Sequence, residues 1–164
     1  MTNSPKYHLA QINIAALEKP LDDPANADFV AQLNPVNEAA DKSPGFVWRL
    51  KSEDGYVSGA DHFSDPLIIV NLTVWSSIEA LWAYTYSNQD HLAVLKARRR
   101  WFKKSGSAFA LWWIPAGHLP TLEEGRHKLT ALAQNGPTVE AFTFKQSYPE
   151  PELKDDHTVL VFPS

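Results

Sequence analysis

Hydrophobic and polar residues alternate along Tyr7–Ile14 and again along Leu67–Trp75. A period of two is typical of a β-strand, because successive side chains point to opposite faces of a sheet. In the second segment the even positions are all aliphatic, namely Ile68, Val70, Leu72 and Val74. The odd positions after Ile69 are Asn71, Thr73 and Trp75. We therefore predict two strands, and we expect the aliphatic face of the second strand to lie against helices.

A helical pattern follows the first strand. Apolar residues recur every three or four positions from Phe29 to Ala40, which predicts a helix. Asp23 and Pro24 supply a capping carboxylate and a proline at the first helical position. Pro35 is expected to kink this helix or to split it into two.

The residues after the second strand predict two further helical segments. Ser76–Glu79 is a capping box, so a helix begins there and runs to about Tyr86. Asn88 can cap a second segment, His91–Lys104.

Two more strands, Phe46–Lys51 and Ala108–Ile114, complete a β-α-β-β-α-β order, and a further helix opens at the capping box Thr121–Glu124. This is the order of the ferredoxin-like split βαβ unit. It predicts an α+β fold in which an antiparallel four-stranded sheet has helices on one face. The other face then needs a cover, and a second copy of the chain would provide one in a dimer.

The length of 164 residues and the hydrophobic share of 44% suit one globular domain. We expect this domain to span residues 1–144. A charged, proline-containing C-terminal extension then covers residues 145–164, in which Thr158–Phe162 is a candidate edge strand.

Charge and composition exclude several classes of function. The net charge of −4 and the pI near 5.8 argue against a nucleic-acid partner. The absence of cysteine excludes disulfides and thiolate metal sites, and it fits a reducing cytosol. We expect no secretory signal in the short, polar stretch Met1–Lys6, and no apolar run approaches the roughly 18 residues of a membrane span. The six histidines lack zinc-site spacing, so we expect no metal site, and we expect a cytoplasmic protein with no membrane partner.

Several stretches resemble a known superfamily. Asn71–Leu81 resembles the strand-to-helix signature of the dimeric α/β-barrel proteins, which include the antibiotic-biosynthesis monooxygenases and related haem-degrading monooxygenases. The chain more closely resembles one bacterial family of that superfamily, whose function is unassigned. Four segments carry this resemblance, namely Tyr7–Gln11, Gly45–Leu50, Arg98–Phe102 and Leu111–His118. The resemblance covers about residues 7–144. It implies the fold and a homodimer, and it confers no activity by itself.

The resemblance also implies candidate site residues. In the cofactor-independent, quinone-forming monooxygenases of the superfamily, an Asn and a Trp four residues later line the substrate cavity. Asn71 and Trp75 match that spacing. The tyrosine that those enzymes carry soon after the Trp has no clear counterpart, because Leu81 and Trp82 occupy that region. Pure packing is the other interpretation of Trp75.

His91 and Arg98 lie in the middle of the apolar stripe of their predicted helix, two turns apart on one face. Two interpretations are open. Either Arg98 pairs with an internal carboxylate and His91 is a satisfied core residue, or both side chains serve a pocket. In the second case, Arg98 would hold a carboxylate or enolate and His91 would move a proton.

The remaining candidates would bind a substrate rather than act on it. Gln11 and Asn13 share one face of the first strand, and their amides need partners that either a polar ligand or other side chains can supply. Trp48 and Trp113 lie on flanking strands, and His118 lies in a turn at a strand end, where it is a candidate for a pocket rim.

Three functions are compatible with these residues. The first is a cavity that binds a small hydrophobic or aromatic ligand, with cofactor-independent oxidation of an aromatic or polyketide-like compound. That chemistry needs a polar group such as Arg98, Asn71 or His91 to stabilise an enolate. The second is a haem protein with His91 as the axial ligand. The third is a non-catalytic binding or structural dimer.

Overall fold

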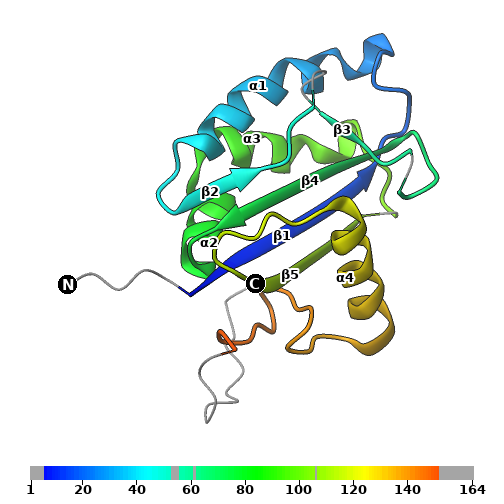
Figure 1. The fold of residues 1–164 in the computed structure, drawn as a ribbon. Coiled ribbons are helices and arrows are strands. Elements are labelled where there is room, and N and C mark those ends of the chain that lie inside the picture. The colour runs from blue at the N-terminus through cyan, green and yellow to red at the C-terminus, as the bar shows by residue number, and fades with distance from the viewer. Residues whose placement is uncertain (1–5, 53–55, 61, 106, 152–164) are drawn as a thin grey trace.

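The computed structural model describes residues 6–52, 56–60, 62–105 and 107–151, and its centre is an antiparallel sheet (Figure 1). The strands β1 (Tyr7–Ala16), β2 (Phe46–Arg49), β4 (Ile68–Trp75) and β5 (Ala108–Pro115) lie in the order β2-β4-β1-β5. A two-residue strand, β3 (Val57–Ser58), also pairs with β4. This strand order is that of the ferredoxin-like unit, so the predicted α+β fold class is confirmed.

Three of the helices begin at a side-chain cap, and the predicted cap Asp23 opens a short 3-10 turn before the first helix. The helices are α1 (Ala27–Asp41), α2 (Ile78–Ser87), α3 (Gln89–Ala97) and α4 (Leu122–Asn135), with short 3-10 turns η1 (Pro24–Asn26) and η2 (Arg98–Arg100). Ser77, Asn88 and Thr121 each accept a hydrogen bond from a backbone N–H in the first turn of the helix that follows. Among the described residues, no helix combines the length and the apolar character needed to cross a membrane.

Of the two outcomes predicted for Pro35, a split helix is excluded, because α1 continues through it from Ala27 to Asp41. The prediction for the end of a later helix was wrong. The helix that was expected to reach Lys104 ends at Ala97 and gives way to the η2 turn.

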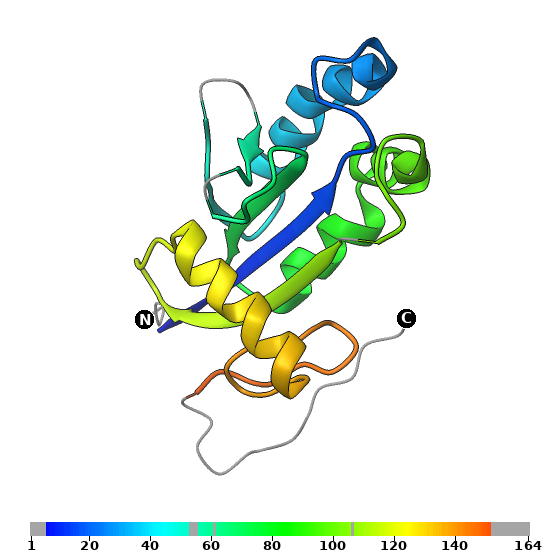
Figure 2. The same ribbon diagram turned by 90° about the vertical axis from the view of Figure 1, so that its right-hand side faces the viewer.

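The faces of the sheet are exchanged relative to the prediction. The odd-numbered face, with Leu9 and Trp75, packs against α1 and α2 through residues such as Ala40 and Leu81. The aliphatic even-numbered face packs instead against α4, whose Leu129 joins its core cluster. Helices therefore cover both faces, and α4 lies on the side opposite α1 and α3 (Figure 2). Alternation alone could not show which face the helices α1 and α2 cover. The polar residues in the middle of the odd-numbered face suggest exposure to solvent, but they lie under a cavity.

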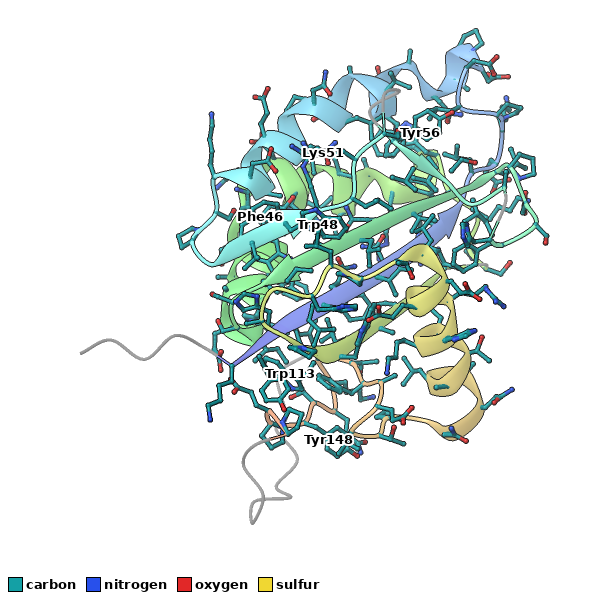
Figure 3. The ribbon with its side chains drawn as sticks, in the orientation of Figure 1. Phe46, Trp48, Lys51, Tyr56, Trp113 and Tyr148 are labelled. Atoms are coloured by element: carbon teal, nitrogen blue, oxygen red, sulfur yellow. The ribbon has the colours of Figure 1, made fainter. Side chains whose placement is uncertain are left out.

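The segment after α4 returns to the free side of β5. Leu111 and Phe142 exchange two backbone hydrogen bonds, of 2.8 and 2.9 Å. Beyond residue 144, the Tyr148 carbonyl accepts a hydrogen bond of 2.8 Å from Trp113 Nε1 (Figure 3). Packing onto the domain thus continues past the expected boundary at residue 144. The candidate strand Thr158–Phe162 lies outside the described residues.

Candidate functional site

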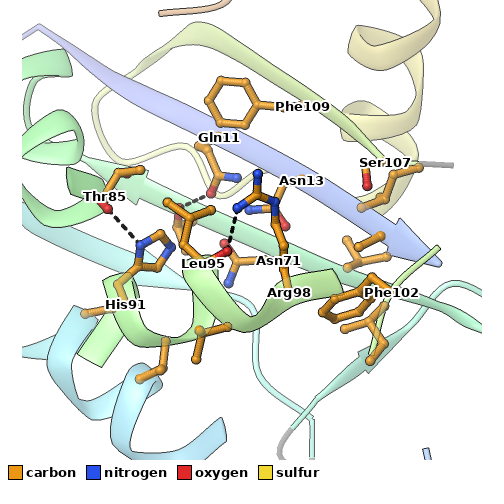
Figure 4. Close-up of a pocket in the computed structure, with 18 of the residues that line it drawn as sticks. Gln11, Asn13, Asn71, Thr85, His91, Leu95, Arg98, Phe102, Ser107 and Phe109 are labelled. Atoms are coloured by element: carbon orange, nitrogen blue, oxygen red, sulfur yellow. Dashed lines mark hydrogen bonds between the residues drawn. The ribbon is translucent and has the colours of Figure 1, made fainter. Parts of the chain in front are cut away.

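A cavity of about 700 Å³ lies between the odd-numbered face of the sheet and the helices α1 and α3 (Figure 4). Six of the nine predicted site residues line it. They are Gln11, Asn13, Asn71, Trp75, His91 and Arg98. Because β1 and β4 are hydrogen-bonded neighbours and α3 crosses above them, residues about 80 positions apart in the sequence meet around one space.

Amide side chains form the floor of the cavity. Asn13 on β1 lies directly opposite Asn71 on β4, and Gln11 lies opposite Thr73. Neither Asn13 nor Asn71 makes a side-chain hydrogen bond to another described residue. Both side chains are half-buried and line the cavity, so their amides are available to a ligand or to water.

A chain of hydrogen bonds orients the Gln11 amide. Trp75 Nε1, which is only a donor, donates to Thr73 Oγ1 over 2.8 Å, and that hydroxyl donates to Gln11 Oε1 over 2.7 Å. If the amide were reversed, the Thr73 hydroxyl would accept twice and its own proton would lack an acceptor. Gln11 is only 3% exposed, yet its nitrogen is left to donate into the cavity (Figure 4).

His91 presents a neutral imidazole to the cavity. Its Nδ1 lies 2.9 Å from the carbonyl oxygen of Thr85, which can only accept, so Nδ1 carries the proton and Nε2 keeps its lone pair. Burial lowers the pKa of His91, and the hydrogen bond to Thr85 opposes this only partly. The histidine is therefore a base at neutral pH and not a cation.

Arg98 extends from the end of α3 toward the sheet (Figure 4). Its Nη1 donates to the carbonyl oxygen of Leu95, and it forms no ion pair with any carboxylate in the described ranges. The expectation that Arg98 is buried within a helical stripe was wrong, because the helix ends at Ala97 and the side chain is exposed at the cavity. Its guanidinium thus keeps donors for a ligand.

Aromatic side chains form much of the apolar wall. Trp75 is fully buried and lies against Tyr84, with ring centroids 5.2 Å apart, while Phe109 and Phe144 stack at 5.4 Å elsewhere in the lining. Tyr84 donates to the carbonyl oxygen of Val36, and burial raises the pKa of its phenol. It remains protonated and therefore acts as a wall and not as a base.

Three predicted residues are not among those that line this cavity. Trp48 on β2 lies opposite Val74, on the face that α4 helps to cover. Trp113 donates to the backbone of Tyr148. The Nε2 of His118 lies 2.7 Å from Glu124 at the start of α4.

Sequence reasoning missed Thr73, Tyr84 and Thr85, which connect or position the predicted residues. Thr73 had a detectable signal, because it shares the face of Asn71 and Trp75. Tyr84 and Thr85 had none, since their roles depend on how α2 turns into α3.

The donor set does not point to a metal centre. Among the described residues, no group of three or more His, Asp or Glu side chains is arranged to hold a metal ion. Haem is a different case, because the Nε2 lone pair of His91 has the protonation state that an axial ligand needs.

The fold is α+β with ferredoxin-like topology, and it encloses a cavity between the sheet and the helices. The chain belongs to the family described as Domain of unknown function (DUF3291), whose model matches residues 8–158. This confirms the expected family of unassigned function. No curated protein matches the sequence.

Solved structures share the fold at low sequence identity. PA3566 from Pseudomonas aeruginosa has a TM-score of 0.52 and 11% identity, with 70% of this chain and 100% of that chain covered. SO0527 from Shewanella oneidensis has a TM-score of 0.50 and 5% identity, with 68% of this chain and 93% of that chain covered. SnoaB from Streptomyces nogalater, described as a cofactor-independent oxygenase, has a TM-score of 0.47 and 17% identity, with 70% of this chain and 96% of that chain covered. At these identities the likeness concerns the fold.

Proposed function

We propose that the cavity binds an aromatic small molecule and that the protein oxygenates it without a bound cofactor. One arrangement carries the proposal. The amides of Gln11, Asn13 and Asn71 and the guanidinium of Arg98 line the same apolar cavity as the basic nitrogen of His91. Hydrogen-bond donors around a single base suit a reaction in which the base creates an anion and the donors stabilise it.

The reaction can be written with these residues. His91 Nε2 takes a proton from an acidic methylene of the substrate, and the resulting enolate oxygen is held by an amide N–H or by Arg98. Dioxygen then reacts with the electron-rich carbon. One oxygen atom becomes a carbonyl on that carbon, and the other leaves as water with both methylene protons. The substrate supplies all four electrons, so no external reductant is needed.

A model substrate tests the proposal. Anthrone has an acidic methylene flanked by aromatic rings, and its oxidation to the quinone can be followed by absorbance and by oxygen uptake. Asn71→Ala and His91→Gln are each expected to lower kcat/KM by about 10²-fold, since each removes one acid–base or anion-stabilising group. His118→Gln is the matched control, because His118 lies outside the cavity. Equal activity in the wild-type protein and both cavity variants would refute the proposal.

Haem binding is a second candidate, favoured by the fixed tautomer of His91. His91 would be the axial ligand, and haem would supply oxygen activation or electron transfer when bound. Titration of the protein with haemin is expected to give a Soret band that His91→Ala removes. A spectrum of free haemin throughout the titration would reject this candidate.

We also propose a homodimer. On the even-numbered face, α4 packs over β5 and β1, and the other end of the sheet, at β2, keeps the partly exposed Trp48 beside the exposed Val47. These residues surround a shallow hollow, so a partner chain can bury them.

A further inference from the structure

The charges around the cavity are all of one sign. Seven Lys and Arg side chains are among its lining residues, and no described Asp or Glu is. The whole chain, by contrast, has 15 basic and 19 acidic residues. Nearly half of the basic residues of an acidic protein therefore line a single cavity.

Five of these basic residues come from two segments. Arg98, Arg99, Lys103 and Lys104 lie between α3 and β5, and Lys145 lies in the segment that follows α4. The backbone N–H of Lys103 donates to the carbonyl oxygen of Ala16, which anchors this connection at the end of β1. The first segment is thus held at the sheet, and we call the five residues together the cationic cluster.

The cationic cluster has no internal compensation. Of the seven basic lining residues, Arg49 is neutralised by Asp41, with contacts of 2.7 and 3.2 Å. No member of the cationic cluster forms an ion pair with a carboxylate in the described part of the chain, and Arg98 contacts only a backbone carbonyl. Like charges brought together repel one another, and an apolar wall beside them strengthens their field. An anion at this position would relieve the repulsion.

We propose that the ligand of this cavity is an aromatic compound with an ionised acid group, held by the cationic cluster. The aromatic body would lie against the apolar wall and the amide floor, where the Gln11 amide nitrogen faces the cavity. The acid group is a carboxylate, sulfonate or phosphate, which share the negatively charged oxygens that Lys and Arg bind. This inference rests on the proposed function, because it names the substrate class of the same cavity.

Two fluorescent probes separate the charge from the aromatic body. 8-Anilinonaphthalene-1-sulfonate and N-phenyl-1-naphthylamine have the same ring system, and only the first carries an acid group. Titration of the wild-type protein is expected to give a Kd about tenfold lower for the sulfonate, and raised salt should reduce this preference. Competition by 2-naphthoate and by 2-naphthyl phosphate would then show which acid group is preferred.

Charge variants locate the effect. Lys103→Gln/Lys104→Gln should weaken sulfonate binding by about tenfold and leave the neutral probe unchanged, because it removes two cations at the cavity. Arg126→Gln/Lys128→Gln removes two cations from α4, away from the cavity, and should change neither Kd. Thermal unfolding of each variant checks that it is folded.

The outcomes distinguish this inference from the proposed function. If both probes bind with equal Kd in every variant, the anionic substrate class is wrong and the aromatic site stands. If neither probe binds the wild-type protein, the proposed function and this inference both fail. A loss of sulfonate binding that is equal in the two double variants would also overturn the role of the cationic cluster.

Discussion

Trp75, Thr73 and Gln11 show how single residues prepare the floor of the cavity. The indole can only donate, so the direction of the hydrogen bonds is set at Trp75 and passes through Thr73 to the Gln11 carbonyl oxygen. The Gln11 nitrogen is the end of this chain. A residue that sequence analysis identified as a site candidate is therefore oriented by a neighbour, Thr73, that it treated as part of the strand.

The pH dependence of stability is a prediction at this scale. Burial lowers the pKa of His91 below its ordinary value of 6.5. Above pH 6.5 both the folded and the unfolded states are neutral at this residue. Below it the unfolded chain binds a proton and the folded protein resists, so the free energy of unfolding falls with falling pH until the folded pKa is passed.

Urea denaturation at pH 7.5 and pH 5.5 measures this effect. Acidification should cost the wild-type protein more stability than it costs His91→Gln, with a ceiling of about 1.4 kcal/mol per pH unit. The other histidines are present in both proteins, so their contribution cancels in the comparison. An identical loss of stability in the two proteins would contradict the assignment of a buried, neutral His91.

At the scale of elements, the sequence predicted the strands and the helix starts because both depend on local signals. Asn88 and Thr121 cap helices as expected, whereas the capping residue of α2 is Ser77 and not Ser76, the first residue of the predicted capping box. The choice of sheet face depends on long-range packing, which alternation does not encode. The end of α3 was missed for a related reason, since the apolar residues Trp101 and Phe102 continue the helical spacing but pack against Phe29 from a non-helical segment.

Gly45, in the turn before β2, provides a prediction for one element. Its φ is +84°, and a Cβ there would overlap the side chains of Ala80 and Ser76 at the start of α2. Gly45→Ala should destabilise the protein by about 1–3 kcal/mol through backbone strain and by a further amount of about 1–3 kcal/mol through overpacking.

Gly117→Ala is the matched control, because Gly117 also has a positive φ, of +96°, but has no atom within 4 Å of the added Cβ. It should therefore show the strain alone. Chemical denaturation of both variants measures the difference, and equal losses would show that the turn does not pack tightly against α2.

At the scale of the whole molecule, α4 changes the argument for a dimer. The sequence predicted that one sheet face stays bare for a partner, but α1 and α2 pack on the odd-numbered face and α4 covers much of the even-numbered face. The homodimer stays a prediction. The surface that we expect to form its interface is now limited to β2 around Trp48. This could not be foreseen, because the Thr121 capping box predicts a helix but not the side on which it packs.

Sedimentation tests this interface. The wild-type protein should sediment at twice the chain mass of 18.4 kDa at micromolar concentration, and Trp48→Glu should sediment as a single chain. The variant places a carboxylate in a surface that must lose its water on association, which disfavours the dimer. A wild-type monomer under these conditions would refute the prediction.

The pairing of Phe142 with Leu111 has a consequence for aggregation. β5 and β2 lie at the two ends of the sheet order, and an open edge strand is a template on which other chains can polymerise. The returning segment occupies backbone groups of β5 that would otherwise be offered to another strand. The edge at β2 is protected differently, by its length of four residues and by an irregular register between Phe46 and Trp48. Both ends of the sheet thus discourage fibril growth.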